Sequence, residues 1–314
     1  MILHRSSMFL RYINFINTIK TEKKLGDHII LDRPVEKIHY DENGVKVVTK
    51  PGKDTTESIE IEAKYAISTI PLGVLQREPA DVGYVTFDPP FPKDKLAAIK
   101  DFKMGNYEKI YVQFDTNFWG DKEVLMSVNI DRPPSESIMT WGLNLDIPKY
   151  FPGSKMLTFH CMGITARRIA KEPIEKIKQE VYDIMNEMFP GKATFPTNLV
   201  VTTWTIEPFS YGSWSAMPKR HGLPGYSKDE WSIVRRHEKM LFFAGEHTSY
   251  NYGFVHSAYQ SGHDVAEDVL IAMGKAQPNN STVRKFCPGK MYDPVKPMPS
   301  MTPTTPMSPP RKMR

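Results

Sequence analysis

The sequence predicts a mixed α/β fold, in which two strand-rich regions are combined with helices. Residues 28–75 and 107–119 show the alternation of apolar and polar residues that is typical of β-strands. Residues 171–191 instead carry apolar residues at helical spacing, with Pro173 in the first turn and Gly191 at the end. With 314 residues, the chain is long enough for one large domain or two ordinary ones.

Composition is that of a soluble globular protein, with 40% hydrophobic and 25% charged residues. The formal net charge of +5 derives in good part from the two termini, so we expect no nucleic-acid partner. The two cysteines, Cys161 and Cys287, have neither the number nor the spacing of a metal site or a disulfide framework. No apolar run approaches the roughly 20 residues that a membrane span needs.

The N-terminal segment, residues 1–27, has two interpretations. Apolar residues at helical spacing favour an ordinary helix, and they are Met8, Leu10, Ile13, Ile16 and Ile19. Alternatively, the basic residues and the absence of any acid before Glu22 are typical of a basic amphipathic presequence.

The first strand-rich region predicts a sheet. Residues 28–50 contain two strands, with the turn sequence Asp-Glu-Asn-Gly at 41–44 between them. Residues 59–75 continue the alternation and then run apolar into Pro71 and Gly73, which predicts a buried last strand that ends at Pro71. Prolines between Pro79 and Pro92 mark a domain boundary.

The second region begins with a short helix over residues 93–105, stopped by Gly105. The strand over 107–119 directs its alternate side chains to opposite faces, with Ile110 and Lys109 on different faces. Further strands are predicted over 155–163 and 198–209.

Residues 242–262 predict a strand, a polar loop and a final helix that begins near 253–255. Glu246 follows the strand, and its carboxylate can accept hydrogen bonds from vicinal hydroxyls, while Gly245 permits close approach to the backbone. The helix N-terminus adds free N–H groups and a partial positive charge. A bound polyol with an anionic end would suit this arrangement. The alternative is that Glu246 caps the loop, with His247 as a neighbouring hydrogen-bonding group.

Residues 276–314 are rich in Pro, Ser, Thr and Met without periodicity, which predicts a disordered tail.

Several segments together resemble the flavin-containing amine oxidases, most closely the polyamine oxidases. They are LFFAGEHTS, GFVHSAYQSG and AEDVL near the C-terminus, with YAISTIPLGVLQ, FDPPFPKDKLAAIKDFKMGNYEKIYVQFDTNFW, MFPGK and TTWTIEPFSYGSWSAMP upstream in the same order. The resemblance covers roughly residues 28–270. It implies a partial FAD-binding Rossmann-like domain (28–80 and 236–275) and a substrate-binding domain (81–235) with a mixed sheet flanked by helices.

The resemblance also implies catalytic residues. Lys109 lies where the family has the lysine that holds a water near flavin N5; otherwise it would be an ordinary surface lysine. Trp214 and Phe254 lie at the two aromatic positions that flank the amine, although Trp214 is larger than the usual residue there. The alternative for both is that they are core aromatics.

Cofactor contacts follow from the same resemblance. Val35 would meet the adenine of FAD, and Glu246, beside Gly245, would meet the ribityl or diphosphate part. The main-chain amides of Phe254 and Val255 would meet flavin O2 at the helix start. Ser213 stands where a covalently bound flavin would need a cysteine, so we expect FAD to be non-covalent.

One family feature is absent from the sequence. No G-x-G-x-x-G occurs anywhere, although the family's diphosphate-binding unit carries it. We therefore expect about 150–200 residues of the family's domains to be missing. We also expect weak FAD binding or none by this chain alone, and a possible partner chain that supplies the nucleotide-binding half.

The expected function is oxidation of an amine, in particular a polyamine, with O2 as acceptor, giving H2O2, an aldehyde and an amine. Alternatives within the family are a monoamine or amino-acid oxidase and a histone demethylase, although the long helical insertion of the demethylase is not visible. From another class, the chain could be a non-catalytic fragment or pseudoenzyme subunit, or a truncated version of a full oxidase. The C-terminal Arg-Lys-Met-Arg matches no targeting signal, so cytoplasmic localisation is only a default.

Overall fold

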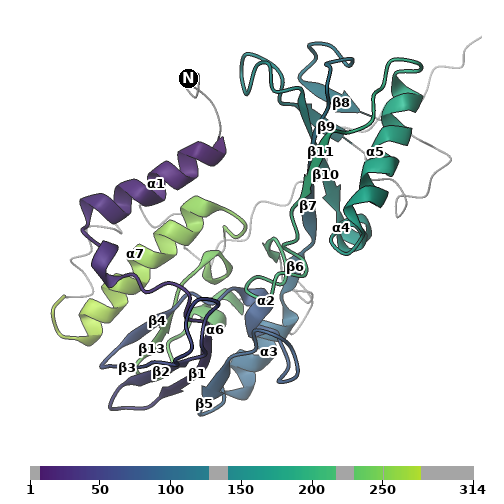
Figure 1. Ribbon diagram of the computed structural model, residues 1–314. Coiled ribbons are helices and arrows are strands. Elements are labelled where there is room, and N and C mark those ends of the chain that lie inside the picture. The colour runs from purple at the N-terminus through teal and green to yellow at the C-terminus, as the bar shows by residue number, and fades with distance from the viewer. Residues whose placement is uncertain (1–7, 127–140, 217–229, 250, 277–314) are drawn as a thin grey trace, which may run out of the picture. The chain divides into compact units, whose positions relative to one another are not determined.

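The computed structural model describes residues 8–126, 141–216, 230–249 and 251–276 (Figure 1). The predicted tail lies outside these residues from position 277 onward, as do the side chains of Met8, Leu10 and Ile13. Helix α1 spans Met8–Glu22, which confirms a helix in the N-terminal segment, and a 3-10 turn follows at Gly26–His28. The described residues up to Val265 belong to one compact unit, and those from Ala266 to residue 276 belong to a second.

The first sheet has four strands in the order β3-β2-β1-β5. Strands β1 (Val35–Tyr40) and β2 (Val45–Thr49) form the predicted hairpin, in which Asp41 accepts hydrogen bonds from the N–H groups of Asn43 and Gly44. Strand β3 (Glu60–Ala63) pairs antiparallel with β2, and β5 (Thr86–Asp88) pairs parallel with β1.

The predicted buried last strand is wrong in extent. Residues 59–75 divide between β3, which is exposed along its length, and β4 (Ala66–Ser68), which ends three residues before Pro71. Strand β4 pairs parallel with β13 (Leu241–Phe243) in a separate two-stranded sheet. Short helix α2 (Leu72–Leu75) follows at once.

Helix α3 spans Lys93–Asp101 and ends before the predicted Gly105. Phe102 leaves the helix with an extended backbone and is buried against Trp231, with ring centroids 5.3 Å apart. Residues Lys103–Gly105 then form β6, which pairs with β12 (Trp214–Ala216). Tertiary burial of Phe102 thus ends the helix earlier than the glycine would.

The second large sheet has five strands in the order β11-β7-β10-β9-β8. Every described pairing within it is antiparallel, so the predicted mixed sheet is corrected in this detail. The strands are β7 (Tyr107–Gln113), β8 (Val124–Met126), β9 (Trp141–Asn144), β10 (Met156–Met162) and β11 (Asn198–Val201). Strand β11 is shorter than predicted, because turns and bends follow it within residues 204–213.

Two helices accompany this sheet, α4 (Gly163–Ile169) and α5 (Ile174–Met188), and Figure 1 shows α5 running alongside the strands. Burial on β7 alternates as predicted, with Ile110 and Val112 at 0% exposure. Ile177 and Val181 of α5 are also fully buried, whereas Ile174 is exposed. These side chains form one hydrophobic core with the inner face of the sheet.

A second core lies among β1, β13, α3 and α6 (Glu230–Arg235), and includes Ile38, Phe102 and Leu241. Residues 85–102 and 231–234 therefore pack with the strands of residues 35–47, although the sequence assigned them to the substrate-binding domain. The predicted boundaries at 80/81 and 235/236 stay predictions. The chain then passes through a 3-10 turn (Glu246–Thr248) into helix α7 (Val255–Ala272), as predicted for 242–262.

Candidate active site

Lys109 lies on the half-exposed face of β7, opposite the hydrophobic core. Its main-chain N–H donates to Thr202 Oγ1 at 2.8 Å, and its carbonyl accepts from Thr202 N–H at 2.9 Å, so the backbone is held to the segment after β11. Partial burial lowers the pKa of the ammonium group. No acidic side chain among the described residues forms an ion pair with it.

Tyr107 connects the start of β7 with Trp214. Ser213 Oγ accepts the Tyr107 N–H at 2.9 Å and donates to the Tyr107 carbonyl at 2.7 Å. The ring of Tyr107 lies 5.1 Å from that of Trp214, centroid to centroid. The two hydrogen bonds between Ser213 and Tyr107 therefore fix the chain immediately before Trp214 against the strand that carries Lys109.

Trp214 packs against two glycines. A Cβ at Gly105 would come within 3.1 Å of the indole ring, and a Cβ at Gly253 within 3.2 Å. Gly253 has φ of +77°, a backbone conformation that favours glycine. Because Gly253 directly precedes Phe254, this packing brings the two predicted aromatic positions into one region.

Glu246 fastens the same region from the other side. Its Oε1 accepts the Ser215 N–H at 2.9 Å, and Oε2 accepts from Ser215 Oγ at 2.8 Å and from Gly253 N–H at 2.7 Å. Both carboxylate oxygens thus bind this chain's own donors, which matches the alternative in which Glu246 orders a loop. Its predicted contact with ligand hydroxyls stays a prediction.

Phe254 and Val255 stand exposed at the start of α7, at 54% and 48%. The first N–H groups of a helix have no acceptor within it, so α7 offers donors and positive partial charge here. Gly245 donates its N–H to Ser261 Oγ of α7 at 2.9 Å and has φ of +134°. A Cβ at Gly245 would meet the ring of His247 at 2.7 Å, so that position requires glycine.

Val35 lies at the start of β1 and lines a cavity of about 430 Å³. The lining is largely apolar, with Lys50 and Asp81 as its charged members, and consists of Pro34, Val35, Lys50, Pro51, Ala80, Asp81, Val82, Gly83, Tyr84 and Phe209. None of the other predicted site residues lines this cavity, so the structure does not bring Val35 together with them there.

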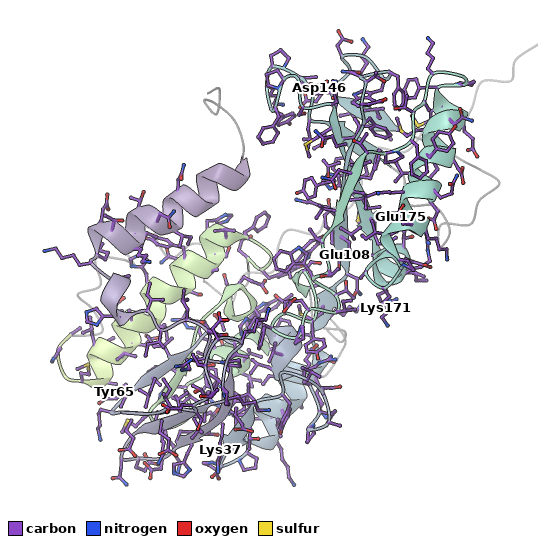
Figure 2. The ribbon with its side chains drawn as sticks, in the orientation of Figure 1. Lys37, Tyr65, Glu108, Asp146, Lys171 and Glu175 are labelled. Carbon is purple, nitrogen blue, oxygen red and sulfur yellow. The ribbon has the colours of Figure 1, made fainter. Side chains whose placement is uncertain are left out.

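Sequence reasoning missed Glu108, which is labelled in Figure 2. Its side chain is fully buried, and its carboxylate accepts from Thr202 Oγ1 at 2.7 Å, Trp204 N–H at 3.2 Å, and the N–H and Oγ1 of Thr205 at 2.8 and 2.6 Å. A charged residue on the apolar face of a strand was the available signal. Glu108 fixes the turn that holds the backbone of Lys109.

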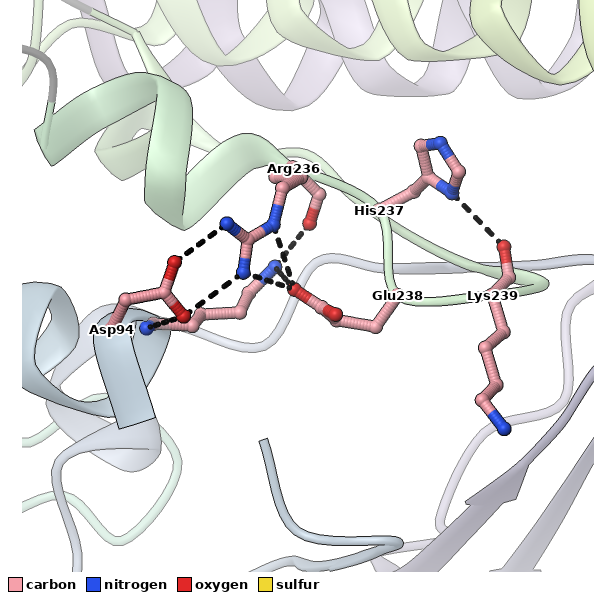
Figure 3. A network of polar contacts seen from close by, with 6 residues as sticks. Asp94, Arg236, His237, Glu238 and Lys239 are labelled. Atoms are coloured by element: carbon pink, nitrogen blue, oxygen red, sulfur yellow. Dashed lines mark hydrogen bonds and ion pairs between the residues drawn. The ribbon is translucent and has the colours of Figure 1, made fainter. Parts of the chain in front are cut away.

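A second missed network contains Lys95, which is fully buried on α3. Its Nζ lies 3.4 Å from Glu238 and 3.7 Å from the ring centre of Phe243, and donates to the Arg236 carbonyl. Arg236 bridges Asp94 and Glu238, as Figure 3 shows. Burial lowers the pKa of Lys95 to about 8, and that of nearby His247 to about 4. This network secures α3 to the segment that leads into β13.

His160 on β10 is the third missed residue. Its ring stacks on Trp141, with centroids 3.9 Å apart, and Nδ1 forms a hydrogen bond with the hydroxyl of Tyr107. Burial, reinforced by the positive charge of Lys109, lowers its pKa to about 4. A lone histidine in a strand carries little signal of its own in a sequence.

Comparison with known proteins identifies the family to which this chain belongs. A profile of the flavin containing amine oxidoreductases matches residues 3–270, and the chain belongs to this family. Polyamine oxidase 1 of Zea mays is 30% identical over 278 residues, which cover 86% of this chain and 49% of that protein. The chain spans about half the length of the curated relatives it matches.

Solved structures show the same fold. Cyclohexylamine oxidase from Brevibacterium oxydans matches with a TM-score of 0.59 and 19% identity, over 80% of this chain and 51% of that one. A triple mutant of putrescine oxidase, made in a redesign of cofactor binding, matches with a TM-score of 0.61 and 17% identity, over 81% and 52%. The predicted mixed α/β fold class is confirmed, and it is the fold of these amine oxidases.

The family implies a flavin, and the start of α7 offers donors that fit the ring of one. The exposed start of α7 suits the electron-rich carbonyl edge of a flavin ring, and Gly253 leaves Trp214 beside it. Within the described ranges, no group of three or more His, Cys, Asp or Glu could hold a metal ion. In the same ranges, no helix has the length and apolar character needed to cross a membrane.

Proposed function

We propose that this chain carries the amine-facing part of an FAD-dependent amine oxidase that acts on a polyamine. The observation that carries the proposal is the double attachment of Glu246 to Ser215 and Gly253. These residues adjoin Trp214 and Phe254, so one carboxylate keeps two aromatic walls in register. Such walls would orient an amine and exclude water from its reacting carbon.

Each residue then has a role. Trp214 and Phe254 flank the amine, and the amides of Phe254 and Val255 hold the pyrimidine edge of the ring. Lys109, half-buried and without an acidic partner among the described residues, holds a water and orients O2. Hydride acceptance from the amine carbon and electron delivery to O2 are the chemistry that a bound FAD would supply. The amine then leaves as an imine, which water converts to an aldehyde and a shorter amine, and O2 leaves as H2O2.

Two observations support the finer parts of this proposal. Polyamine oxidases stand among the relatives that match most of this chain, which favours a polyamine over a monoamine or amino acid as substrate. Ser213 occupies the position at which a cysteine could bind flavin covalently, and its hydroxyl is engaged with Tyr107. FAD is therefore held without a covalent bond.

The half-length match bears on the cofactor. The diphosphate of FAD needs a Gly-rich turn at a helix N-terminus, and the described residues contain no such unit. We propose that a further segment or a partner chain completes the nucleotide site. A non-catalytic subunit that pairs with such a partner is the competing function.

The experiment is a visible absorption spectrum of the purified chain after addition of excess FAD and removal of the unbound part. Retained flavin bands, followed by H2O2 formation with spermidine but not with benzylamine or an amino acid, would support the proposal. Turnover of benzylamine alone would overturn the substrate class. A colourless protein would show that this chain by itself is not a flavoprotein.

A second test addresses Glu246 directly. In Glu246→Gln the amide can replace only one of the two carboxylate oxygens, so the Ser215 or the Gly253 bond is lost. We expect the free energy of unfolding to fall by about 1–2 kcal/mol. The indole N–H resonance of Trp214, assigned with Trp214→Phe, should also move. Glu42→Gln, which alters an exposed acid 3.8 Å from Lys239, is the control and should change neither quantity. An unmoved Trp214 resonance would contradict the role of Glu246.

A further inference from the structure

Two buried polar atoms without a hydrogen-bond partner lie on strand β10. They are Thr158 Oγ1 and His160 Nε2, and their residues are only 4% and 7% exposed. A buried polar group that lacks a partner costs free energy, so such groups usually bind an ordered water. Both belong to the strand that pairs directly with β7.

The register of the two strands places these atoms with Lys109. His160 lies opposite Lys109 and Thr158 lies opposite Tyr111 in the antiparallel pair. Residues two apart on a strand share a face, and directly opposite residues share it too. Thr158, His160 and Lys109 therefore project from the same face of the sheet. Thr158 and His160 are next neighbours on this face, since the Cα atoms of residues two apart on a strand are roughly 6.6 Å apart.

The imidazole is fixed in orientation. Trp141 stacks on one face of the ring at 3.9 Å between centroids, and Tyr107 bonds to Nδ1. Burial raises the pKa of Tyr107, so its hydroxyl is neutral, and it donates a hydrogen bond to Nδ1 in the tautomer whose ring proton is on Nε2. In that tautomer Nε2 is a hydrogen-bond donor on the face of β10 that also carries the Thr158 hydroxyl.

We propose that Thr158 and His160 bind one ordered water across the strand pair from Lys109, and that this water hydrates and positions the Lys109 ammonium group. Water can accept from Nε2–H and donate to the threonine oxygen, which satisfies both buried atoms at once. Thr158 and His160 are positioning residues in this arrangement. The site stands on this chain's own side chains, and its bearing on oxygen chemistry rests on the proposed function.

The charges around Lys109 are consistent with this role. On the same face, the titratable groups are Tyr107 and Tyr111 of β7 and His160 of β10, and β11 contributes none. Glu108 points to the other face and is bonded to residues 202–205. His160 is neutral near pH 7, so none of these groups places a negative charge beside the lysine cation, and a bound water would offset part of its desolvation.

The test is an NMR titration of the lysine side chains in the purified chain, with Lys109 assigned through Lys109→Met. Thr158→Val and His160→Phe remove the two groups that hold the water, so Lys109 loses hydration. Its pKa should then fall by roughly half a unit or more in each variant. His160→Gln keeps a donor near the Nε2 position and should restore the wild-type pKa. Ser154→Ala, which removes a buried, unpartnered hydroxyl from the loop before β10, should leave it unchanged.

Thermal unfolding of Thr158→Val supplies an independent readout. If Thr158 Oγ1 truly lacks a partner, valine removes a buried unsatisfied group and the melting temperature rises. If the hydroxyl binds water, valine lowers the melting temperature. A rise, or an unchanged Lys109 pKa in Thr158→Val, would overturn the proposal. Neither measurement needs flavin or amine turnover. The two results therefore test this proposal separately from the proposed function.

Discussion

The two faces of strand β7 carry neighbouring charged residues with very different numbers of partners. On the core face, the Glu108 carboxylate accepts four hydrogen bonds, each from a residue of the turn at 202–205. On the other face, Lys109 is half-buried, and no acidic side chain among the described residues pairs with it. The two residues are adjacent in sequence. The Glu108 carboxylate is fully hydrogen-bonded within this chain, whereas the Lys109 ammonium group is available to a ligand.

The difference shows that one face of the strand can stabilise the fold while the other carries a functional group. A buried carboxylate that binds main-chain N–H groups fixes a turn and contributes stability. A desolvated lysine without a counter-ion contributes none, and its lowered pKa records that cost. Removal of either residue should therefore reveal which face is structural and which is functional.

Glu108→Ala should have the largest effect. It leaves the N–H groups of Trp204 and Thr205 without their acceptor in a buried setting, and we expect a loss of about 3 kcal/mol or more in the free energy of unfolding. Chemical denaturation of the purified chain measures it. The matched control, Lys109→Ala, should cost less than about 1 kcal/mol. Equal losses in the two variants would remove the contrast between the faces.

The pH dependence of His160 should be the next largest effect. Its pKa in the folded chain is about 4, against an ordinary 6.5, so the unfolded chain takes up a proton first as the pH falls. The contribution of neutral His160 to the free energy of unfolding is fully present above pH 6.5. It is lost progressively toward pH 4, by up to roughly 3 kcal/mol at about 1.4 kcal/mol per pH unit.

His247 lowers the stability of the folded chain over the same pH range, since burial lowers its pKa to about 4 as well. The measurement is therefore the difference between wild type and His160→Gln, each unfolded by denaturant between pH 4 and 7. The wild type should lose more stability than the variant over this interval. Parallel curves would mean that the pKa of His160 is the same in the folded and the unfolded chain, so that burial does not lower it.

Local patterns predicted much of this fold but not the partnerships within the site. The β1–β2 hairpin followed from its turn sequence, and α5 from its apolar spacing, because each depends on neighbours in sequence. The end of α3 depended on the burial of Phe102, and the pairing of β4 with β13 joins residues far apart in the chain. Such contacts leave no local pattern.

The candidate site divides in the same way. Glu246 and the start of α7 stood out in sequence because a strand, a glycine and a helix N-terminus follow one another. That Glu246 would bind Ser215 and Gly253, or that His160 would lie opposite Lys109, could not be read from the sequence, because sheet register and loop packing decide both.

Lys109→Met should have the smallest effect on stability and the most specific effect on chemistry. Methionine keeps the apolar stem and removes a charge that no acidic residue on this face balances, so the free energy of unfolding should change by less than about 0.5 kcal/mol. The pKa of His160 should rise, because Lys109 now contributes to lowering it, and histidine NMR titration would measure that rise.

In FAD-loaded protein that includes the segment or partner completing the nucleotide site, the same variant should retain near-normal FAD content while flavin reoxidation by O2 slows. Stopped-flow absorbance after anaerobic reduction measures the rate, and Lys155→Met, which alters an exposed lysine at the other end of the β7–β10 pair, is the control. A collapse of FAD content, or a large loss of stability in Lys109→Met, would make Lys109 a structural residue like Glu108. Both faces of β7 would then carry structural residues, although these have different partners.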